Sequence, residues 1–332
     1  MTKGVRTLLI TAAALTAAGA LTAAGAYLLG GRPWSTEGYE ARSADFGAAQ
    51  VSGIDADLGT ADVRISGVSG DRITVRWYDG REDRCGVSLD GGTLRAVRTK
   101  TGSGKWYSRL FSFTRPGGDE NTVEIGVPSS WQGKLSLRSD TGGMELDGTV
   151  CADGSSLSAG TGDILVRGAR FLGGAEFSVS TGSISLESAQ AQGALTLTAG
   201  TGDAALRDVT AQSVRVSQTT GGLTGESIRC TGRFETERGT GDAALSDVAA
   251  ADFSSRATTG STRAERLSVD SSAAFTAETG DVTFSLTDGI GQYAVTVRTA
   301  TGGSNLTAGG AGPKALTVVT TTGSIDASFD AR

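Results

Sequence analysis

A Thr-Gly dipeptide that recurs about every 20 residues constrains this chain more than any other feature of its sequence. Successive glycines of this motif lie 19 to 22 residues apart. Ten copies at so steady a period predict a solenoid, in which each repeat forms one coil and the coils stack. The ten glycines are Gly142, Gly162, Gly182, Gly202, Gly221, Gly241, Gly260, Gly280, Gly302 and Gly323.

Apolar and polar residues alternate on both sides of each Thr-Gly pair. The second and fourth residues after the glycine are mostly apolar, as in Ile164 and Val166, whereas the fifth never is, as in Arg167. A second apolar pair precedes the glycine, as in Leu195 and Leu197. This period of two indicates strands with one buried face. We expect an all-β fold, a single-stranded β-solenoid (β-helix) of about 20 residues per coil.

The sequence divides into three segments. Residues 1–31 form an N-terminal membrane anchor or signal segment, residues 32–43 a linker, and residues 44–332 a β-solenoid ectodomain. Within the ectodomain, 44–130 contains irregular first coils with an inserted loop at 98–118, and 131–332 contains the regular Thr-Gly repeats.

The N-terminal segment has the composition of a transmembrane helix. Residues 7–31 carry no charge and can cross a hydrocarbon core of about 30 Å. Lys3 and Arg6 precede this run, which predicts a cytoplasmic N-terminus and an extracytoplasmic body on a single-pass protein of the cell membrane. The alternative is a signal peptide cleaved at Ala24-Gly25-Ala26, which would give a secreted protein.

Composition argues against most enzymatic chemistry. The 332 residues include no histidine, which removes the commonest general base and metal ligand. No serine lies in a Gly-x-Ser-x-Gly motif, and no phosphate-binding loop ends in Gly-Lys-Ser or Gly-Lys-Thr. The net charge is −6, and residues 131–332 carry 15 basic and 22 acidic side chains. We therefore expect no enzyme activity and no nucleic-acid partner.

Aspartates follow every second corner glycine, as at Asp163, Asp203, Asp242 and Asp281. Coils stack at ~4.8 Å, so these carboxylates would lie about 9.6 Å apart, too far to share one calcium ion. The spacing also avoids a ladder of like charges. We expect a structural role for these residues, with no metal and no cofactor.

The three cysteines, Cys85, Cys151 and Cys230, fit no metal-binding spacing. Cys151 and Cys230 lie at the same position of coils four apart, about 19 Å from each other, well beyond the ~7 Å limit for a disulfide. We interpret them as small buried side chains.

One segment departs from the repeat and is the candidate contact surface. Residues 98–118 combine basic and aromatic side chains on an otherwise acidic protein. This composition predicts contact with anionic lipid, wall polymer or another envelope protein. The alternative is a hairpin whose aromatic residues cover one flank of the solenoid. The candidate residues are Lys100, Lys105, Trp106, Tyr107, Arg109, Phe111 and Arg115.

Charges alternate in sign at the fifth position after the glycine over five successive coils. If these side chains stack, each has an opposite charge above and below it, which stabilises the coil register slightly. The five residues are Asp147, Arg167, Glu187, Arg207 and Glu226.

The N-terminal anchor, the Val123–Pro128 strand and the Leu-x-Leu-x-x-x-Thr-Gly-Gly pattern resemble the bacterial β-strand-repeat putative adhesins, a family of unknown function. The resemblance covers roughly 44–332. It implies a β-solenoid fold and a place in the cell envelope, in some members beside envelope-stress systems. It provides no catalytic residue to transfer.

Three functions are consistent with these features. The first is a membrane-tethered, non-enzymatic module for binding or envelope-stress signalling, with the membrane as a partner through the N-terminal helix. The second is a purely structural spacer or scaffold. The third, a polysaccharide-active enzyme, would need clustered carboxylates on one face, and the scattered acids argue against it.

Overall fold

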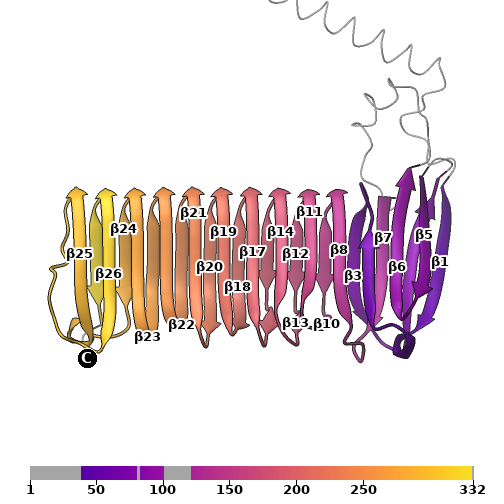
Figure 1. Cartoon of the computed structure of the whole chain (residues 1–332), viewed down its shortest axis with the longest axis horizontal. Coiled ribbons are helices and arrows are strands. Elements are labelled where there is room, and N and C mark those ends of the chain that lie inside the picture. The colour runs from indigo at the N-terminus through magenta and orange to yellow at the C-terminus, as the bar shows by residue number, and fades with distance from the viewer. Residues whose placement is uncertain (1–38, 81–82, 101–120, 331–332) are drawn as a thin grey trace, which may run out of the picture.

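The computed structural model describes residues 39–80, 83–100 and 121–330. These residues form an elongated stack of strands that runs from β1 at one end to β25 at the other (Figure 1). One hydrogen-bonded ladder joins all 27 strands of the described chain. The predicted all-β solenoid is therefore confirmed. The predicted N-terminal helix lies outside the described residues.

Most regular coils contribute to three faces. The incoming face consists of strands that mostly lead into a corner: β2 (Gly53–Asp57), β5 (Asp83–Asp90), β6 (Thr93–Lys100), β8 (Lys134–Thr141), β11 (Ser155–Thr161), β14 (Ala175–Thr181), β17 (Ala194–Thr201), β19 (Ser213–Thr220), β21 (Arg233–Thr240), β25 (Tyr293–Thr301) and β26 (Lys314–Thr322).

The outgoing face consists of strands that mostly follow a corner: β1 (Glu40–Gly47), β3 (Asp62–Val68), β4 (Arg72–Asp79), β7 (Thr122–Pro128), β9 (Met144–Asp147), β12 (Ile164–Arg167), β15 (Ile184–Glu187), β18 (Ala204–Ala211), β20 (Leu223–Cys230), β24 (Val282–Leu286) and β27 (Ile325–Phe329).

The short return face begins with β10 (Val150–Cys151), β13 (Arg170–Phe171) and β16 (Gln190–Ala191), and continues through the second halves of β18 and β20. The long strands β22 (Ala243–Thr259) and β23 (Thr262–Thr279) pass through more than one face. Two short 3-10 helices, η1 (Ala48–Gln50) and η4 (Ile290–Gln292), lie in connections near the two ends.

The interior is a continuous apolar column made by the alternation predicted from the sequence. Leu195 and Leu197 are buried before one corner, and Ile164 and Val166 are buried after another. In the last coils, aromatic rings fill the column, and neighbouring ring centroids lie 4.6 to 5.7 Å apart from Phe234 to Phe284. Burial of this column is the main stabilising term of the fold.

The corner glycines are required for two separate reasons, which Gly202 illustrates. Its φ is +139°, a conformation that residues with a side chain rarely adopt. A Cβ on this residue would also lie 2.0 Å from the carbonyl oxygen of Gly182 in the coil before it. The corners therefore stack so closely that only glycine fits.

A second bend, six residues after each corner glycine, was not predicted from the sequence. Its φ is positive in seven successive coils, between +52° and +58°. Gly148 and Gly168 occupy the first two positions, but serine, aspartate and arginine occupy the next five. Because no single residue type marks this bend, the sequence reveals only the first corner.

The chain order is exchanged at the N-terminal end. β2 pairs with both β6 and β8, and β3 pairs with both β7 and β9. The coil around Gly59 therefore lies between the β6–β7 coil and the first regular coil. The first regular coil therefore does not stack on the β6–β7 coil that precedes it in the sequence, because β2 lies between β6 and β8.

A similar exchange occurs at the C-terminal end. β23 pairs with β26 rather than with β25, and β25 pairs only with the far edge of β26 among the named strands. Gly323 consequently stacks on Gly280, and Gly302 stacks outside Gly323. The expected stacking of each coil on the next is therefore wrong for the last two corners.

The predicted linker also needs correction. β1 begins at Glu40, inside the range 32–43, and pairs with β4 in antiparallel register. The strand contains Arg42 and Asp45, and its charged, exposed pattern did not indicate a strand.

Candidate functional site

Of the predicted contact residues, the structure places only Lys100, which is the last residue of β6 and pairs with Asp83. The others, Lys105, Trp106, Tyr107, Arg109, Phe111 and Arg115, lie outside the described residues. The predicted start of the segment is corrected, because residues 98–100 belong to β6.

The segment between β6 and β7 replaces a corner. β6 and β7 run beside β2 and β3, which are joined through Gly59, so residues 101–121 occupy the place in the sequence where other coils have a short turn. At the end of this insertion, Asn121 Nδ2 donates a 2.8 Å hydrogen bond to the carbonyl oxygen of Thr60. The sequence did not show this relationship, because the insertion breaks the regular spacing of the repeat between β6 and β7.

A buried ion pair fixes the strand that leads into this insertion. Arg98 Nε and Nη2 donate to the two carboxylate oxygens of Asp83 at 2.8 and 3.0 Å. The Arg98 side chain is 2% exposed. Breaking a buried pair of this kind leaves a charge without compensation. Arg98 therefore supports β6 from inside and does not contribute to a contact surface.

The chain that precedes β1 enters at the same edge of the molecule. Glu40 pairs with Asp79 at the end of β4, and β4 runs antiparallel to β7, so Glu40 lies on the corner edge. Lys100 and Thr122, on either side of the insertion, lie on this edge too. This edge is at the top of Figure 1.

The charge ladder of the outgoing face has the predicted register but different partners. Arg167 pairs in register with Asp147 and Glu187, and Arg207 with Glu187 and Glu226. The ion pairs Arg167–Glu187 and Arg207–Glu226 form at 3.7 and 3.3 Å. The shortest contact of Arg167, however, is a 2.8 Å hydrogen bond to Glu145.

Glu145 connects this ladder to the N-terminal coils. Arg64 on β3 donates to Glu145 at 3.0 Å and pairs with Glu124 on β7 at 3.5 Å. Arg76 on β4 lies opposite Glu124 in register. The row Arg76, Glu124, Arg64, Glu145 therefore alternates in sign across four strands.

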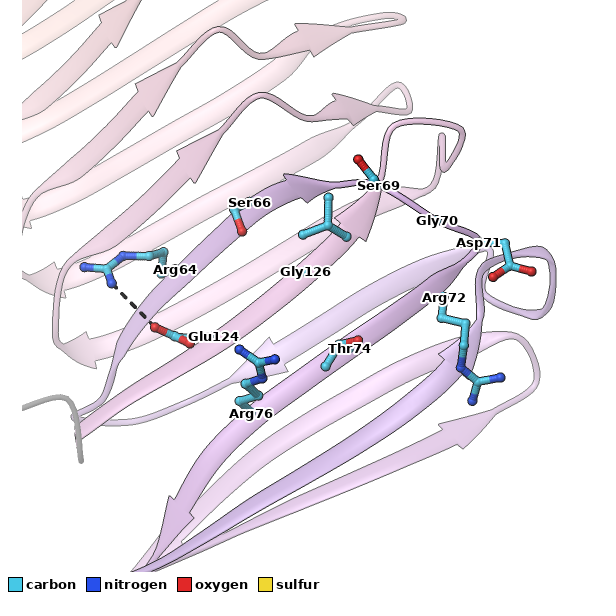
Figure 2. A pocket seen from close by; sticks show the side chains of 11 residues that line it. Arg64, Ser66, Ser69, Gly70, Asp71, Arg72, Thr74, Arg76, Glu124 and Gly126 are labelled. Atoms are coloured by element: carbon cyan, nitrogen blue, oxygen red, sulfur yellow. Dashed lines mark ion pairs between the residues drawn. The ribbon is translucent and has the colours of Figure 1, made fainter.

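Beside this row lies a groove of about 460 Å³, which we call the arginine groove. It is lined by β3 from Arg64 to Val68, by the turn at 69–71, by Arg72, Thr74 and Arg76 of β4, and by Glu124 and Gly126 of β7. Figure 2 shows the turn at one end and the charged row at the other. The groove was not predicted from the sequence, where a glycine at an outward strand position, Gly126, was the available signal.

The groove exists because Gly126 lacks a side chain. Its neighbours Ile125 and Val127 are buried, so position 126 points outward on the face. A Cβ there would lie 3.1 Å from Val68 Cγ1 and would project into the groove. The floor is therefore strand backbone with Ser66 and Thr74 on either side.

The cysteines are buried, and all three are free thiols, so the prediction of no Cys151–Cys230 disulfide is confirmed. Burial raises the pKa of the Cys85 and Cys151 thiols to about 11 and that of Cys230 to about 12. Neutral thiols are poor nucleophiles and poor metal ligands.

The corner aspartates join adjacent coils. Asp163 Oδ1 accepts a 2.7 Å hydrogen bond from the Ser183 amide, and Asp203 Oδ1 accepts one of the same length from the Gly222 amide. Asp242 and Asp281 repeat this contact. Within the described ranges, no group of three or more acidic, histidine or cysteine side chains could hold a metal ion.

In the part of the chain that the structure describes, no helix has the length and apolar character needed to cross a membrane. The predicted anchor, residues 7–31, lies outside that part.

A family model matches most of the chain. The model described as Toastrack DUF4097 matches residues 51–246 and, in a second overlapping alignment, residues 174–328. No curated protein matches the chain in sequence.

Several solved structures are similar. A putative adhesin from Bacteroides fragilis aligns over 87% of this chain and 97% of its own, with 13% identity and a TM-score of 0.42. A putative adhesin from Parabacteroides distasonis aligns over 87% and 98%, with 11% identity and a TM-score of 0.37. A putative lipid binding protein from the same species aligns over 89% and 96%, with 11% identity and a TM-score of 0.35. At TM-scores this low, none of the three bears on what this chain binds.

Proposed function

The chain belongs to the Toastrack DUF4097 family, and from this premise we propose that it is a membrane-tethered, extracytoplasmic and non-enzymatic binding module. The N-terminal segment holds it in the cell membrane, and the basic and aromatic residues between β6 and β7 contact an anionic envelope surface. The absence of histidine and the buried, neutral thiols support a role without catalysis.

One observation carries this proposal: the start of β1 and the end of β6, to which the proposed anchor and the proposed contact segment connect, lie on the same edge at the same end of the solenoid. Glu40 and Lys100 both lie on the corner edge among the N-terminal coils. Only eight residues separate Gly31 from Glu40, and they span at most about 30 Å. A membrane anchor would therefore keep the contact segment close to the headgroups, where each basic residue contributes about 1 kcal/mol.

Co-sedimentation with liposomes tests the contact. Protein without residues 1–31 is mixed with anionic and with neutral liposomes. We expect binding to anionic liposomes only, weakened by salt. Replacing Lys100, Lys105, Arg109 and Arg115 with serine should remove it. A matched variant replaces four basic residues elsewhere with serine and should bind as the wild type does: Arg170, Arg233, Arg256 and Arg298.

Equal binding by the wild type and the first variant would contradict the proposed contact and favour the structural spacer. The anchor is tested separately by N-terminal sequencing of the exported protein. A sequence beginning at Tyr27 would show that the segment is a cleaved signal peptide.

A further inference from the structure

We propose that the arginine groove binds an anionic saccharide, a sugar that carries a carboxylate or a phosphate group. This inference rests on the proposed function, because it names a ligand class for the same binding module. It concerns a different surface from the segment between β6 and β7.

The first argument is that the guanidinium group of Arg76 is available to bind a ligand. Its register partner Glu124 forms an ion pair with Arg64 instead. The guanidinium group of Arg76 has no ion-pair or hydrogen-bond partner among the described residues, and Arg76 is exposed. Figure 2 shows its guanidinium group between Glu124 and Thr74, facing the groove. Its planar set of donors matches the two oxygens of a carboxylate or phosphate.

The second argument is the supply of groups that recognise hydroxyls. Ser66 and Ser69 line the groove, and their hydroxyl groups have no partner in the described part of the chain. The Thr74 hydroxyl donates to Asp45 Oδ1 at 2.8 Å, so its oxygen can still accept a hydrogen bond. The carboxylates of Asp71 and Glu124 can accept hydrogen bonds from sugar hydroxyls.

The third argument is shape. The floor at Gly126 is backbone, so one face of a sugar ring can lie directly on the strand. Val68, which is 36% exposed, gives the rim one apolar contact for a ring face. A volume of about 460 Å³ lies within the usual range for small-ligand sites. An acyl chain would need a more apolar lining than this groove provides.

The fourth argument is charge. Three arginines and two acids line the groove, which gives it a net positive charge. Residues 131–332 carry a net charge of −7. The groove is therefore a cationic spot at one end of an acidic molecule, and anion binding there should weaken as salt increases.

Isothermal titration calorimetry of the full-length protein in a nonionic detergent tests this inference. The probes are trigalacturonate, glucose 6-phosphate and neutral maltotriose. We expect one or both anionic probes to bind and maltotriose not to bind. Binding of trigalacturonate alone would assign the groove to carboxylated sugars, and binding of glucose 6-phosphate alone to phosphorylated ones.

Two variants locate the binding. Arg76→Gln should weaken it about tenfold, the usual effect of losing one charge-assisted contact. Gly126→Thr should abolish it by filling the groove. The matched control is Arg256→Gln on the incoming face: Arg256 also lies opposite a glutamate, Glu237, and has no ion pair among the described residues. It should bind as the wild type does. Thermal melts verify that each variant is folded.

The inference is overturned if neither anionic probe binds, if maltotriose binds equally well, or if both groove variants bind like the wild type. Its failure is distinct from failure of the proposed function. Groove variants should leave liposome co-sedimentation unchanged, and loss of liposome binding in the serine variant does not depend on the groove.

Discussion

The middle of the solenoid and its two ends are built from similar coils, but these coils stack in different orders. From Gly142 to Gly280 the coils stack in the order of the chain, and each corner glycine contacts the one before it. At the N-terminal end the Gly59 coil is enclosed by two coils that come later in the sequence. At the C-terminal end the Gly323 coil is enclosed between two that come earlier.

The difference shows what a repeat motif determines. Thr-Gly and its alternation determine how the chain turns at a corner and which side chains each strand buries. They do not determine the order of coils at an end, where one edge has no neighbour and must be protected from strand addition. Exchanging the order places the last coil of the chain, β26–β27, inside the stack, where it is hydrogen-bonded on both edges over the incoming face.

Each end is also closed by local structure. At the N-terminal end, β1 and β5 add antiparallel strands to the two long faces. At the C-terminal end, Gly309 exchanges backbone hydrogen bonds of 2.7 and 3.0 Å with Val295 on β25. The Asn305 side chain bonds Asp326 and the backbone of Ala327 on β27. These contacts cover part of the strand edges that would otherwise be open.

The largest expected effect concerns the corners. Gly202→Ala in the middle should destabilise the protein by about 4 kcal/mol, because the methyl group would meet a carbonyl oxygen at 2.0 Å and the φ is positive. Gly59→Ala at the end should cost about 1 kcal/mol, since its φ is +56° but nothing in the described part of the chain lies within 4 Å of the new Cβ. Denaturant unfolding measures both.

The matched control for the corners is Gly303→Ala, where the φ is not in the left-handed region and the new Cβ has open space. It should unfold as the wild type does. Equal losses at positions 202 and 59 would show that corner stacking adds nothing to backbone strain, and the contrast between middle and end would disappear.

The second largest difference in stability is expected between variants of two buried arginines. Arg98 at the N-terminal end pairs with Asp83, whereas Arg238 in the middle bonds only hydroxyls, with Thr262 at 2.7 Å. Arg238 Nε and Nη1 have no hydrogen-bond partner among the residues that the structure describes, and burial lowers the pKa of Arg238 to about 10. Arg98→Met should cost about 3 kcal/mol by leaving Asp83 unpaired, whereas Arg238→Met should stabilise by about 1 kcal/mol.

Thermal melts of the two methionine variants test this contrast. When Arg238 is replaced, the nearby hydroxyl groups can still hydrogen-bond to one another, since Ser255 Oγ lies 3.3 Å from both Thr236 Oγ1 and Thr262 Oγ1. A destabilised Arg238→Met protein would mean that this arginine is held by contacts stronger than those hydroxyls.

The sequence predicted the part of this molecule that repeats. Coil length, the buried alternation and the free cysteines follow from residues at fixed offsets, such as Ile164 and Cys151. The exchanged order did not follow, because Gly302 and Gly323 sit in equivalent local sequences. The only trace was a pair of longer steps, 22 and 21 residues, before these two glycines.

The candidate site was predicted less well for a physical reason. A groove depends on which outward positions of neighbouring strands come together, and Gly126 meets Ser66 and Thr74 only through pairings between distant segments. The predicted contact segment was recognisable from composition alone. Its contact with an envelope surface stays a prediction.

The third effect is the response of the thiols to pH. The folded-state pKa of Cys151, about 11, lies above its ordinary value of 9.0 because the thiol is buried. As pH rises, the thiol of the unfolded chain therefore loses its proton first. The contribution of Cys151 to the free energy of unfolding is complete below pH 9 and declines as pH rises from 9 to 11. Cys151→Ala should reduce this loss by about 2 kcal/mol at pH 10.5.

Alkylation by iodoacetamide at pH 8 compares the same two regions. Cys230 on β20, which pairs with β18 and β22 in the middle, should react only on global unfolding, whereas Cys85 on the edge strand β5 should react sooner through local opening of the end. Equal reaction rates for the two thiols would indicate that the end is as stable as the middle.

The smallest effect is in the charge ladder. Arg167→Glu should cost about 1 kcal/mol at low salt, because the new carboxylate would face Asp147, Glu187 and Glu145. High salt should reduce the loss. Arg170→Glu is the matched control: Arg170 is exposed on the same coil and lies beside Val150 and Gln190, which carry no charge. A melt of Arg167→Glu equal to that of the control would show that the ladder contributes nothing.

Disulfide cross-linking tests the exchanged order of the coils most directly. Thr276 pairs with Val319, and Val319 pairs with Arg298 on its other side. Thr276→Cys with Val319→Cys should therefore form a disulfide on mild oxidation, detected by peptide mapping. Thr276→Cys with Arg298→Cys should not, since β26 separates the two by about 9.6 Å, beyond the ~7 Å limit. A disulfide in the second pair and none in the first would mean that the coils stack in chain order to the end and would contradict this account.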